Sequence, residues 1–274
     1  MKITSELVKE LREQTGVGIM ACKNALQEAD GDITHAVDIL RKKGIAKAQK
    51  REGRTASEGQ VQAYIHMGGK IGVLVEVNCE TDFVAKNADF VKFADSILDL
   101  ALEKKPADLE ALKALPMGGK SVAEVIVEQS GTIGEKLDLA YFDYIKAEKV
   151  QAYNHFGNNL ATLVGFNKAN VDEQVAKDVA MQIAAMSPVA VDKDDVPVEI
   201  IEKERKIGRE KALEEGKPEN IVDRIAEGMV NKFLKDNTLL NQEFTKDSKK
   251  TVGQYIWEAD KELKVTGFKR FSVK

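Results

Sequence analysis

The sequence predicts an α+β protein with a small helical bundle, a duplicated core of strands and helices, and a helical hairpin inserted into the second copy. Three observations support this class. Apolar residues recur at helical spacing in three short segments over about the first 44 residues. The hexapeptide VQAYIH at residues 61–66 returns as VQAYNH at residues 150–155. From residue 198 to residue 236 the chain becomes strongly charged but keeps a helical apolar repeat.

Residues 1–45 are predicted to form a three-helix domain. Thr4 or Ser5 caps the first helix, which ends near Gly16, and Asp32 caps the third, which ends at Gly44. Three short helices with apolar stripes can share one small core. The stripes consist of Leu7, Val8, Leu11, Cys22, Ala25, Leu26, Ala29, Ile33, Ala36, Val37 and Leu40.

The core is predicted to contain two related subdomains, residues 60–148 and residues 149–187 joined by 238–274. In the first, alternating apolar residues on both sides of Gly68-Gly69 predict a β-hairpin, and helical spacing from Phe90 to Leu102 predicts a helix after it. The second copy repeats this order. Each subdomain is therefore expected to hold a small antiparallel sheet covered by helices.

The remaining elements are assigned by the same patterns. Between the copies we predict a helix at 121–129 and a strand at 136–146, and near the end a helix at 251–260 and a strand at 265–273. Residues 188–237 form the inserted antiparallel hairpin, which is broken at Gly216 and Pro218. Its facing apolar residues are predicted to be Ile200, Ile207, Ile225, Met229 and Phe233.

Composition narrows the functional classes. Charged residues make up 31% of the chain and the net charge is -4, which argues against a basic nucleic-acid surface. The basic run at residues 46–59 has no interleaved aromatic residue and is predicted to be a solvated linker.

No apolar run approaches the roughly 18 residues of a membrane span, and residues 1–6 lack a signal-peptide core. Cys22 and Cys79 lie in different modules, so we expect an intracellular protein without a disulfide.

One polar segment stands out, because the second strand of the first copy gives way to a helix at Thr81, Asp82, Phe83 and Val84. A purely structural interpretation makes Asp82 or Asn87 a helix N-cap and Phe83 a core residue or hydrophobic staple. The second copy has only the polar turn NKAN, residues 167–170, at this place. A hairpin and helix can therefore be joined without the phenylalanine, which favours a functional role for Phe83.

Two stretches resemble signatures of a known family. Residues 76–86 read EVNCETDFVAK, and residues 11–26 read LREQTGVGIMACKNAL. Both are similar to signatures of the bacterial elongation factor Ts family, whose members are guanine-nucleotide exchange factors for elongation factor Tu. The likeness covers nearly the whole chain. Some members continue into a helical module beyond the position of Lys274, and we expect no contacts from such a module here.

The resemblance implies a ubiquitin-associated-like N-terminal domain and a cytoplasmic protein that binds elongation factor Tu both with GDP and without nucleotide. It implies an exchange factor rather than an enzyme. Dislocation of the Mg²⁺ ion of Tu is assigned by the family motif to Thr81, Asp82, Phe83 and Val84. Contacts with Tu are assigned to Arg12, Met20, Lys23 and His155. The hairpin at residues 188–237 could either touch Tu or join two copies in a homodimer.

One of these assignments has an alternative, and one further position departs from the family pattern. Met20 could belong to the core of the small bundle, with its neighbouring cations merely solvated. Where relatives can place an apolar pair before a Lys-Thr-Val-Gly run, this chain has Thr245 and Lys246, so we expect a more polar patch that contributes less affinity.

Other kinds of chemistry find little support. Cys79 beside Glu80 could act as a nucleophile only with a histidine and an oxyanion nest, and the sequence signals neither. The spacing of His35, His66 and His155 is not typical of a metal site, and no glycine-rich phosphate loop is present. We therefore expect no cofactor, no bound metal and no direct nucleotide binding. The rival functional hypothesis is a non-catalytic adaptor that holds partners through the N-terminal domain and the hairpin.

Overall fold

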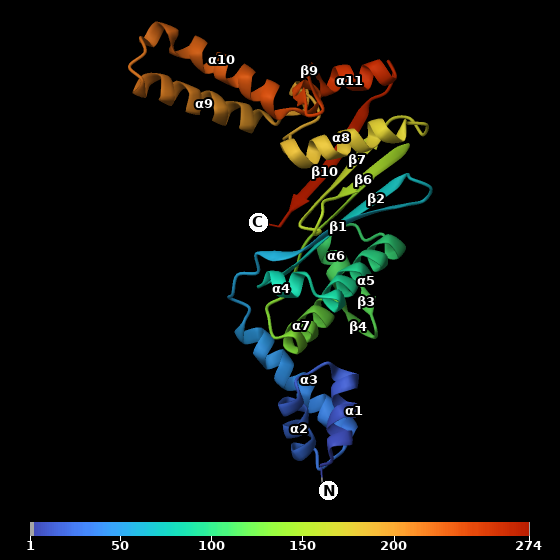
Figure 1. The fold of residues 1–274 in the computed structure, drawn as a ribbon. Helices are drawn as coiled ribbons and strands as arrows, with labels where there is room; N and C mark the ends of the chain where they lie inside the picture. The colour runs from blue at the N-terminus through green and yellow to red at the C-terminus, as the bar shows by residue number, and fades with distance from the viewer. Residues whose placement is uncertain (1–2, 274) are drawn as a thin grey trace.

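The computed structural model describes residues 3–273 and has the predicted α+β class, with helices packed on small antiparallel sheets (Figure 1). A helical bundle lies at one end and a helical hairpin projects at the other, with two sheet-containing subdomains between them (Figure 1). Within the described residues, no helix combines the length and the apolar character needed to cross a bilayer.

The N-terminal bundle consists of α1 (Ser5–Thr15), α2 (Ile19–Glu28) and α3 (Ile33–Lys50). Side-chain oxygens of Thr4 and Asp32 accept backbone N–H groups and cap α1 and α3, as predicted. Gly16 ends α1 with φ of 66°, a left-handed conformation that favours glycine. The predicted apolar stripes meet in one core, whose buried members include Val8, Leu11, Cys22, Ala25, Leu26, Ala36 and Leu40.

The predicted end of the third helix at Gly44 is wrong, because α3 continues to Lys50. Gly44 lies against Gly131 of α7 (Val122–Ile133), and a Cβ on Gly131 would stand 2.7 Å from the backbone of Gly44. Glycine disfavours a helix interior by about 1 kcal/mol, but here it lets two helices approach closely. Residues 46–50 of the expected linker are therefore helical, and the close packing attaches the bundle to the first subdomain.

The first subdomain is built on an antiparallel sheet with strand order β1-β2-β5. The strands are β1 (Glu58–His66), β2 (Ile71–Cys79) and β5 (Asp138–Lys146). Besides α7, the helices are α4 (Asp82–Ala85), α5 (Ala88–Lys104) and α6 (Leu109–Ala114). A short ladder pairs β3 (Pro116–Met117) with β4 (Lys120–Ser121).

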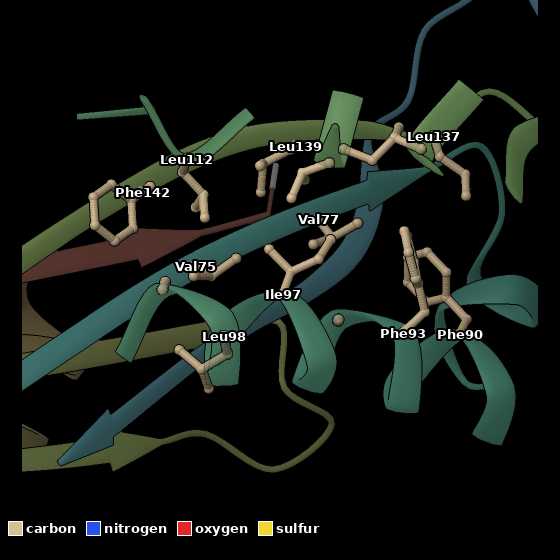
Figure 2. Close-up of a cluster of buried hydrophobic side chains, with 14 of the residues drawn as sticks. Val75, Val77, Phe90, Phe93, Ile97, Leu98, Leu112, Leu137, Leu139 and Phe142 are labelled. Atoms are coloured by element: carbon tan, nitrogen blue, oxygen red, sulfur yellow. The ribbon is translucent and has the colours of Figure 1, made fainter. Parts of the chain in front are cut away.

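One face of this sheet is covered by α5. Figure 2 shows Val75 and Val77 of β2 packed among Phe90, Phe93 and Ile97 of α5, with side chains of β5 beside them. The stripe predicted for this helix is buried throughout, because its 3.6-residue period keeps the apolar side chains on the sheet side. The helix that follows the strand-to-helix junction is therefore fixed to the sheet by its apolar face.

The second subdomain repeats the order of hairpin and helix. Its sheet has the strand order β10-β7-β6, formed by β6 (Lys149–Asn154), β7 (Leu160–Phe166) and β10 (Val265–Ser272). The helix α8 (Glu173–Met186) packs on this sheet, and the C-terminal strand completes it as predicted. The short helix η1 (Lys193–Asp195) precedes the hairpin. Further small elements follow the hairpin and cover the core: η2 (Leu239–Asn241), β8 (Glu243–Phe244), β9 (Asp247–Thr251) and α11 (Val252–Ala259).

The two sheets also pack against each other. Leu74 of β2 is buried in a cluster with Val150 and Leu163 of the second subdomain. Gly72 makes this approach possible, since a Cβ there would stand 2.7 Å from Leu163. Both faces of β2 are therefore buried, one by α5 and the other by the second sheet.

The inserted hairpin consists of α9 (Val198–Glu214) and α10 (Glu219–Asn237), as the charged segment predicted. The prediction of its seam was wrong in one respect, because Ile207 is 42% exposed. A Cβ on Gly208 would stand 3.0 Å from the Cα of Ala226, so small residues bring the two helices close together. The fully buried positions are Gly208, Ala212, Val222, Ala226 and Val230.

Lys246 has a structural role that the sequence did not indicate. Its Nζ donates to Oδ1 of Asp178 at 2.6 Å, and Asp178 is only 5% exposed. Tyr255 and Gln174 donate to the same carboxylate. Burial by itself raises the pKa of Asp178, but these hydrogen bonds outweigh it and hold the pKa below its usual value.

We expect Lys246→Met to destabilise the fold by about 1–3 kcal/mol at pH 7, because it removes a charged partner from a buried carboxylate. Since the pKa of folded Asp178 is depressed, the stabilisation is complete above the unfolded pKa of about 4 and is lost as the pH falls through the folded pKa. Urea unfolding at pH 7 and at low pH, with Lys249→Met as an exposed control, measures this difference. An equal loss at both pH values would contradict the explanation.

Candidate functional site

The segment Thr81–Val84 lies where β2 ends and the one-turn helix α4 begins. Thr81 is the N-cap of α4, since its Oγ1 accepts the N–H of Val84 at 3.4 Å. Asn87 caps α5 by accepting the N–H of Asp89, which confirms one of the two caps considered for this region. Asp82 is the first helical residue and not a cap. Two successive caps thus turn the chain sharply between strand and helix.

Phe83 points into solvent. Its exposed fraction is 83%, whereas Ala85 is buried and Val84 packs on the edge of the first core. The interpretation of Phe83 as a core residue or staple is therefore wrong. An exposed phenylalanine forgoes roughly 1.5–3 kcal/mol of burial, which a partner that covers it can recover.

Asp82 and Lys86 form an exposed ion pair with Nζ and Oδ2 2.6 Å apart. The hydrogen bond from Lys86 holds the pKa of Asp82 below its usual value. Asp82 therefore presents a full negative charge beside Phe83 at neutral pH, with a partner that solvent or another protein can replace.

A carboxylate that sequence reasoning missed supports this segment. Oε2 of Glu135 accepts the backbone N–H groups of Glu80 and Thr81 at 3.1 and 3.0 Å, and Oε1 accepts the hydroxyl of Thr81 at 2.6 Å. Glu135 lies in the loop between α7 and β5, more than fifty positions along the chain. No local pattern joins residues so far apart, so this contact could not be predicted from spacing along the chain.

The loop that holds Glu135 is bound in return by Glu80. Oε1 of Glu80 accepts the backbone N–H of Lys136 at 2.6 Å, and Arg54 lies 3.2 Å from the same carboxylate. The hydrogen bond from Lys136 is the main influence that lowers the pKa of Glu80, and Arg54 adds to it. Two loops are thus tied together by reciprocal bonds from carboxylate to backbone.

Cys79 cannot serve as a nucleophile in this state. Its side chain is buried and its thiol donates to the carbonyl of Thr81 at 3.2 Å. Burial and the nearby charge of Glu135 raise the pKa of Cys79 to about 12, so the thiol stays protonated at neutral pH. Within residues 3–273, no three His, Cys, Asp or Glu side chains gather as they would around a metal ion.

The N-terminal candidates lie on the surface of the bundle. Met20 is 65% exposed and its neighbour Ile19 is 53% exposed, so the interpretation of Met20 as a core residue is wrong. Arg12 of α1 and Lys23 of α2 line one hollow of about 340 Å³ together with Ile19. The bundle thus presents apolar side chains beside two cations.

His155 lies in the turn between β6 and β7. It is exposed, and its Nδ1 is 2.8 Å from the hydroxyl of Tyr153. The next residue, Phe156, is 96% exposed. Sequence reasoning missed it, because no periodic pattern marks an aromatic residue in a turn. The carbonyl of Asn158 accepts the N–H of Val61, which fixes the turn to β1.

The three candidate regions are attached to a shared scaffold. On β1, Gln60 donates to the carbonyl of Ala85 at 2.7 Å and so supports α4, while Val61 holds the turn of His155. A hollow of about 500 Å³ separates the bundle from the same junction, with Gly16 on one side and Val84 on the other. The structure places all three regions around the first subdomain without bringing their candidate side chains into direct contact.

The second copy shows what this junction looks like as a purely structural turn. Asn167 exchanges two hydrogen bonds with the backbone of residues 262 and 264, and Lys168 forms an ion pair with Asp260. These side chains bind within the chain. The exposed phenylalanine of the first copy has no counterpart among them.

Comparison with known proteins gives one consistent result. The family model described as Elongation factor TS matches residues 80–274. A protein of Porphyromonas gingivalis named Elongation factor Ts is 48% identical over 274 residues, which cover 100% of this chain and 99% of the relative. Proteins of the same name from Azobacteroides pseudotrichonymphae (49% over 273 residues, 100% of this chain and 99% of the relative) and Alkalilimnicola ehrlichii (46% over 274 residues, 100% and 92%) are similar throughout.

Proposed function

The chain belongs to the elongation factor Ts family of translation elongation factors, and we propose that it promotes the release of GDP from elongation factor Tu so that GTP can bind. It acts in the cytoplasm by protein contact, without covalent chemistry and without binding the nucleotide itself. The observation that carries this proposal is the exposed Phe83 on a segment held by reciprocal hydrogen bonds to the loop between α7 and β5.

Phe83 acts as a wedge. GDP in such a partner is held through phosphate contacts and through a Mg²⁺ ion that neutralises phosphate charge. Burying the phenylalanine in Tu contributes roughly 1.5–3 kcal/mol, enough to shift a two-state packed element about 10- to 100-fold. Displacing the residues that support the metal loosens the nucleotide without any competing ligand.

Asp82 complements the wedge. It is charged at neutral pH and exposed, and its present partner Lys86 is equally accessible. It can therefore accept N–H groups that the displacement frees in Tu and hold the displaced arrangement. Thr81 and Val84 fix the turn, since the hydroxyl oxygen of Thr81 accepts the N–H of Val84.

Docking relies on regions away from the wedge. Arg12, Met20 and Lys23 present an apolar and cationic surface on the bundle, and His155 offers a further contact on the second subdomain. Several separate contacts orient the wedge, so binding energy gained elsewhere can be used to displace the metal's support.

The coupling between this protein and GDP is reciprocal. If the factor weakens GDP binding by a given ratio, GDP weakens the binding of the factor by the same ratio. The protein therefore accelerates exchange without selecting GTP, and the cellular excess of GTP sets the direction.

Release of fluorescent GDP from purified elongation factor Tu tests the proposal directly. We expect the rate to rise with the concentration of this protein and then to saturate. The rival adaptor would bind Tu, measured in parallel by calorimetry, but would leave the release rate unchanged.

A further inference from the structure

The segment that carries Phe83 does not have the means to hold itself in place. The helix α4 spans four residues, and isolated helices shorter than about 12–15 residues are marginal in water. Phe83 adds nothing to its attachment, since most of that side chain is in solvent. Gln60 and the first core hold the end of α4 through Ala85 and Val84, so the start of the helix is set by contacts to the residues that precede Phe83.

Glu135 makes the main contact of this kind. Its carboxylate accepts three hydrogen bonds from two consecutive residues, the N–H of Glu80 and both the N–H and the hydroxyl of Thr81. Hydrogen bonds to a charged acceptor are roughly twice as strong as neutral ones. Because Thr81 is also the N-cap of α4, its position sets where the helix starts and where Phe83 points.

Glu135 is itself held firmly. Gly134 ends α7 with φ of 94°, a left-handed conformation, and the carbonyl of Glu135 accepts the hydroxyl of Ser130 at 2.5 Å. Glu80 binds the next residue, Lys136, whose ammonium group donates to backbone carbonyls of Glu52 and Arg54. The loop that carries Glu135 is therefore tied to α7, to Glu80 and to the backbone at residues 52 and 54.

We infer that Glu135 is a positioning residue for exchange: it fixes Thr81 and thereby presents Phe83 to the partner. The inference rests on the proposed function and adds to it a residue outside the family motif. It predicts that Glu135 acts through Phe83 alone. If Glu135 were merely structural, removing it would instead lower the stability of the whole fold.

The first test needs no partner. Hydrogen exchange at the amides of Glu80 and Thr81 should quicken about tenfold or more in Glu135→Ala, because both N–H groups lose their acceptor. The matched control is Glu124→Ala, which removes the carboxylate that binds backbone N–H and hydroxyl of Ser121 at the other end of α7. Unchanged protection of the two amides in Glu135→Ala would overturn the inference.

The second test uses the exchange assay in a double-mutant cycle. Glu135→Ala should slow stimulated GDP release about five- to tenfold, because Phe83 is still present but no longer points in the productive direction. Affinity for nucleotide-free Tu should change less than about twofold. In the Phe83→Ala background it should cause no further slowing. Additive losses in that background would overturn the inference in favour of a general structural role.

Glu135→Gln provides the conservative variant. Its amide oxygen can still accept both N–H groups while its amide nitrogen donates to the hydroxyl of Thr81, so it should restore most of the rate. A rate as low as that of Glu135→Ala would overturn the geometric account. Unchanged release in Phe83→Ala would overturn the proposed function itself, whereas normal release in Glu135→Ala beside slow release in Phe83→Ala would overturn only the role of Glu135.

Discussion

Replacing Phe83 with alanine is expected to slow stimulated GDP release about 10- to 100-fold, because the variant loses roughly 1.5–3 kcal/mol of burial in the displaced arrangement of the partner. The fold should be unaffected, since this side chain is 83% exposed. Affinity for nucleotide-free Tu should fall much less, because the docking contacts on the bundle and at His155 remain. Stopped-flow release of fluorescent GDP, with calorimetry for binding, measures both quantities.

Tyr64→Ala is the matched control for this prediction. Tyr64 is another exposed aromatic residue, 57% exposed on β1 of the same sheet, but it lies outside the proposed contact. It should leave the release rate unchanged. Added EDTA should shrink the difference between Phe83→Ala and the unmodified protein, because it removes the metal chemically. Near-normal release in Phe83→Ala combined with Asp82→Ala, with circular dichroism unchanged, would contradict the wedge mechanism.

The second large effect is expected at the N-terminal bundle. The triple variant Arg12→Ala, Met20→Ala, Lys23→Ala should weaken the complex with Tu about 100-fold or more, as expected when an arginine and an apolar anchor are removed from the centre of an interface. Exchange at saturating concentrations of the variant should stay close to normal, since the wedge is intact. The effect therefore separates docking from exchange.

Point variants are preferable to deleting residues before Ile45. The helix α3 runs from Ile33 to Lys50, so that deletion would remove most of the helix, including Gly44, which packs against Gly131. Lys42→Ala, on an exposed position of α3 in the same bundle, serves as the control for lost charge. Unchanged Tu affinity in the triple variant would defeat the assignment of these residues.

The sequence by itself determined the features that depend on neighbours along the chain. The periods of strand and helix are local, so the hairpins, the buried stripe of α5 and the caps at Thr4 and Asp32 could be predicted from spacing and residue type. The repeat near residues 61 and 150 predicted the two subdomains, and the missing counterpart of Phe83 in the second copy pointed to the candidate site.

Only the tertiary structure decided which distant segments meet. Glu135 reaches Thr81 across more than fifty positions, Lys246 pairs with Asp178, and Gly44 packs on Gly131 so that α3 runs past the glycine that was expected to end it. The hairpin seam follows Gly208 and Ala226 rather than the larger apolar residues. In each case the outcome depends on how closely two elements can approach, which is set by packing in three dimensions and leaves no periodic mark in the sequence.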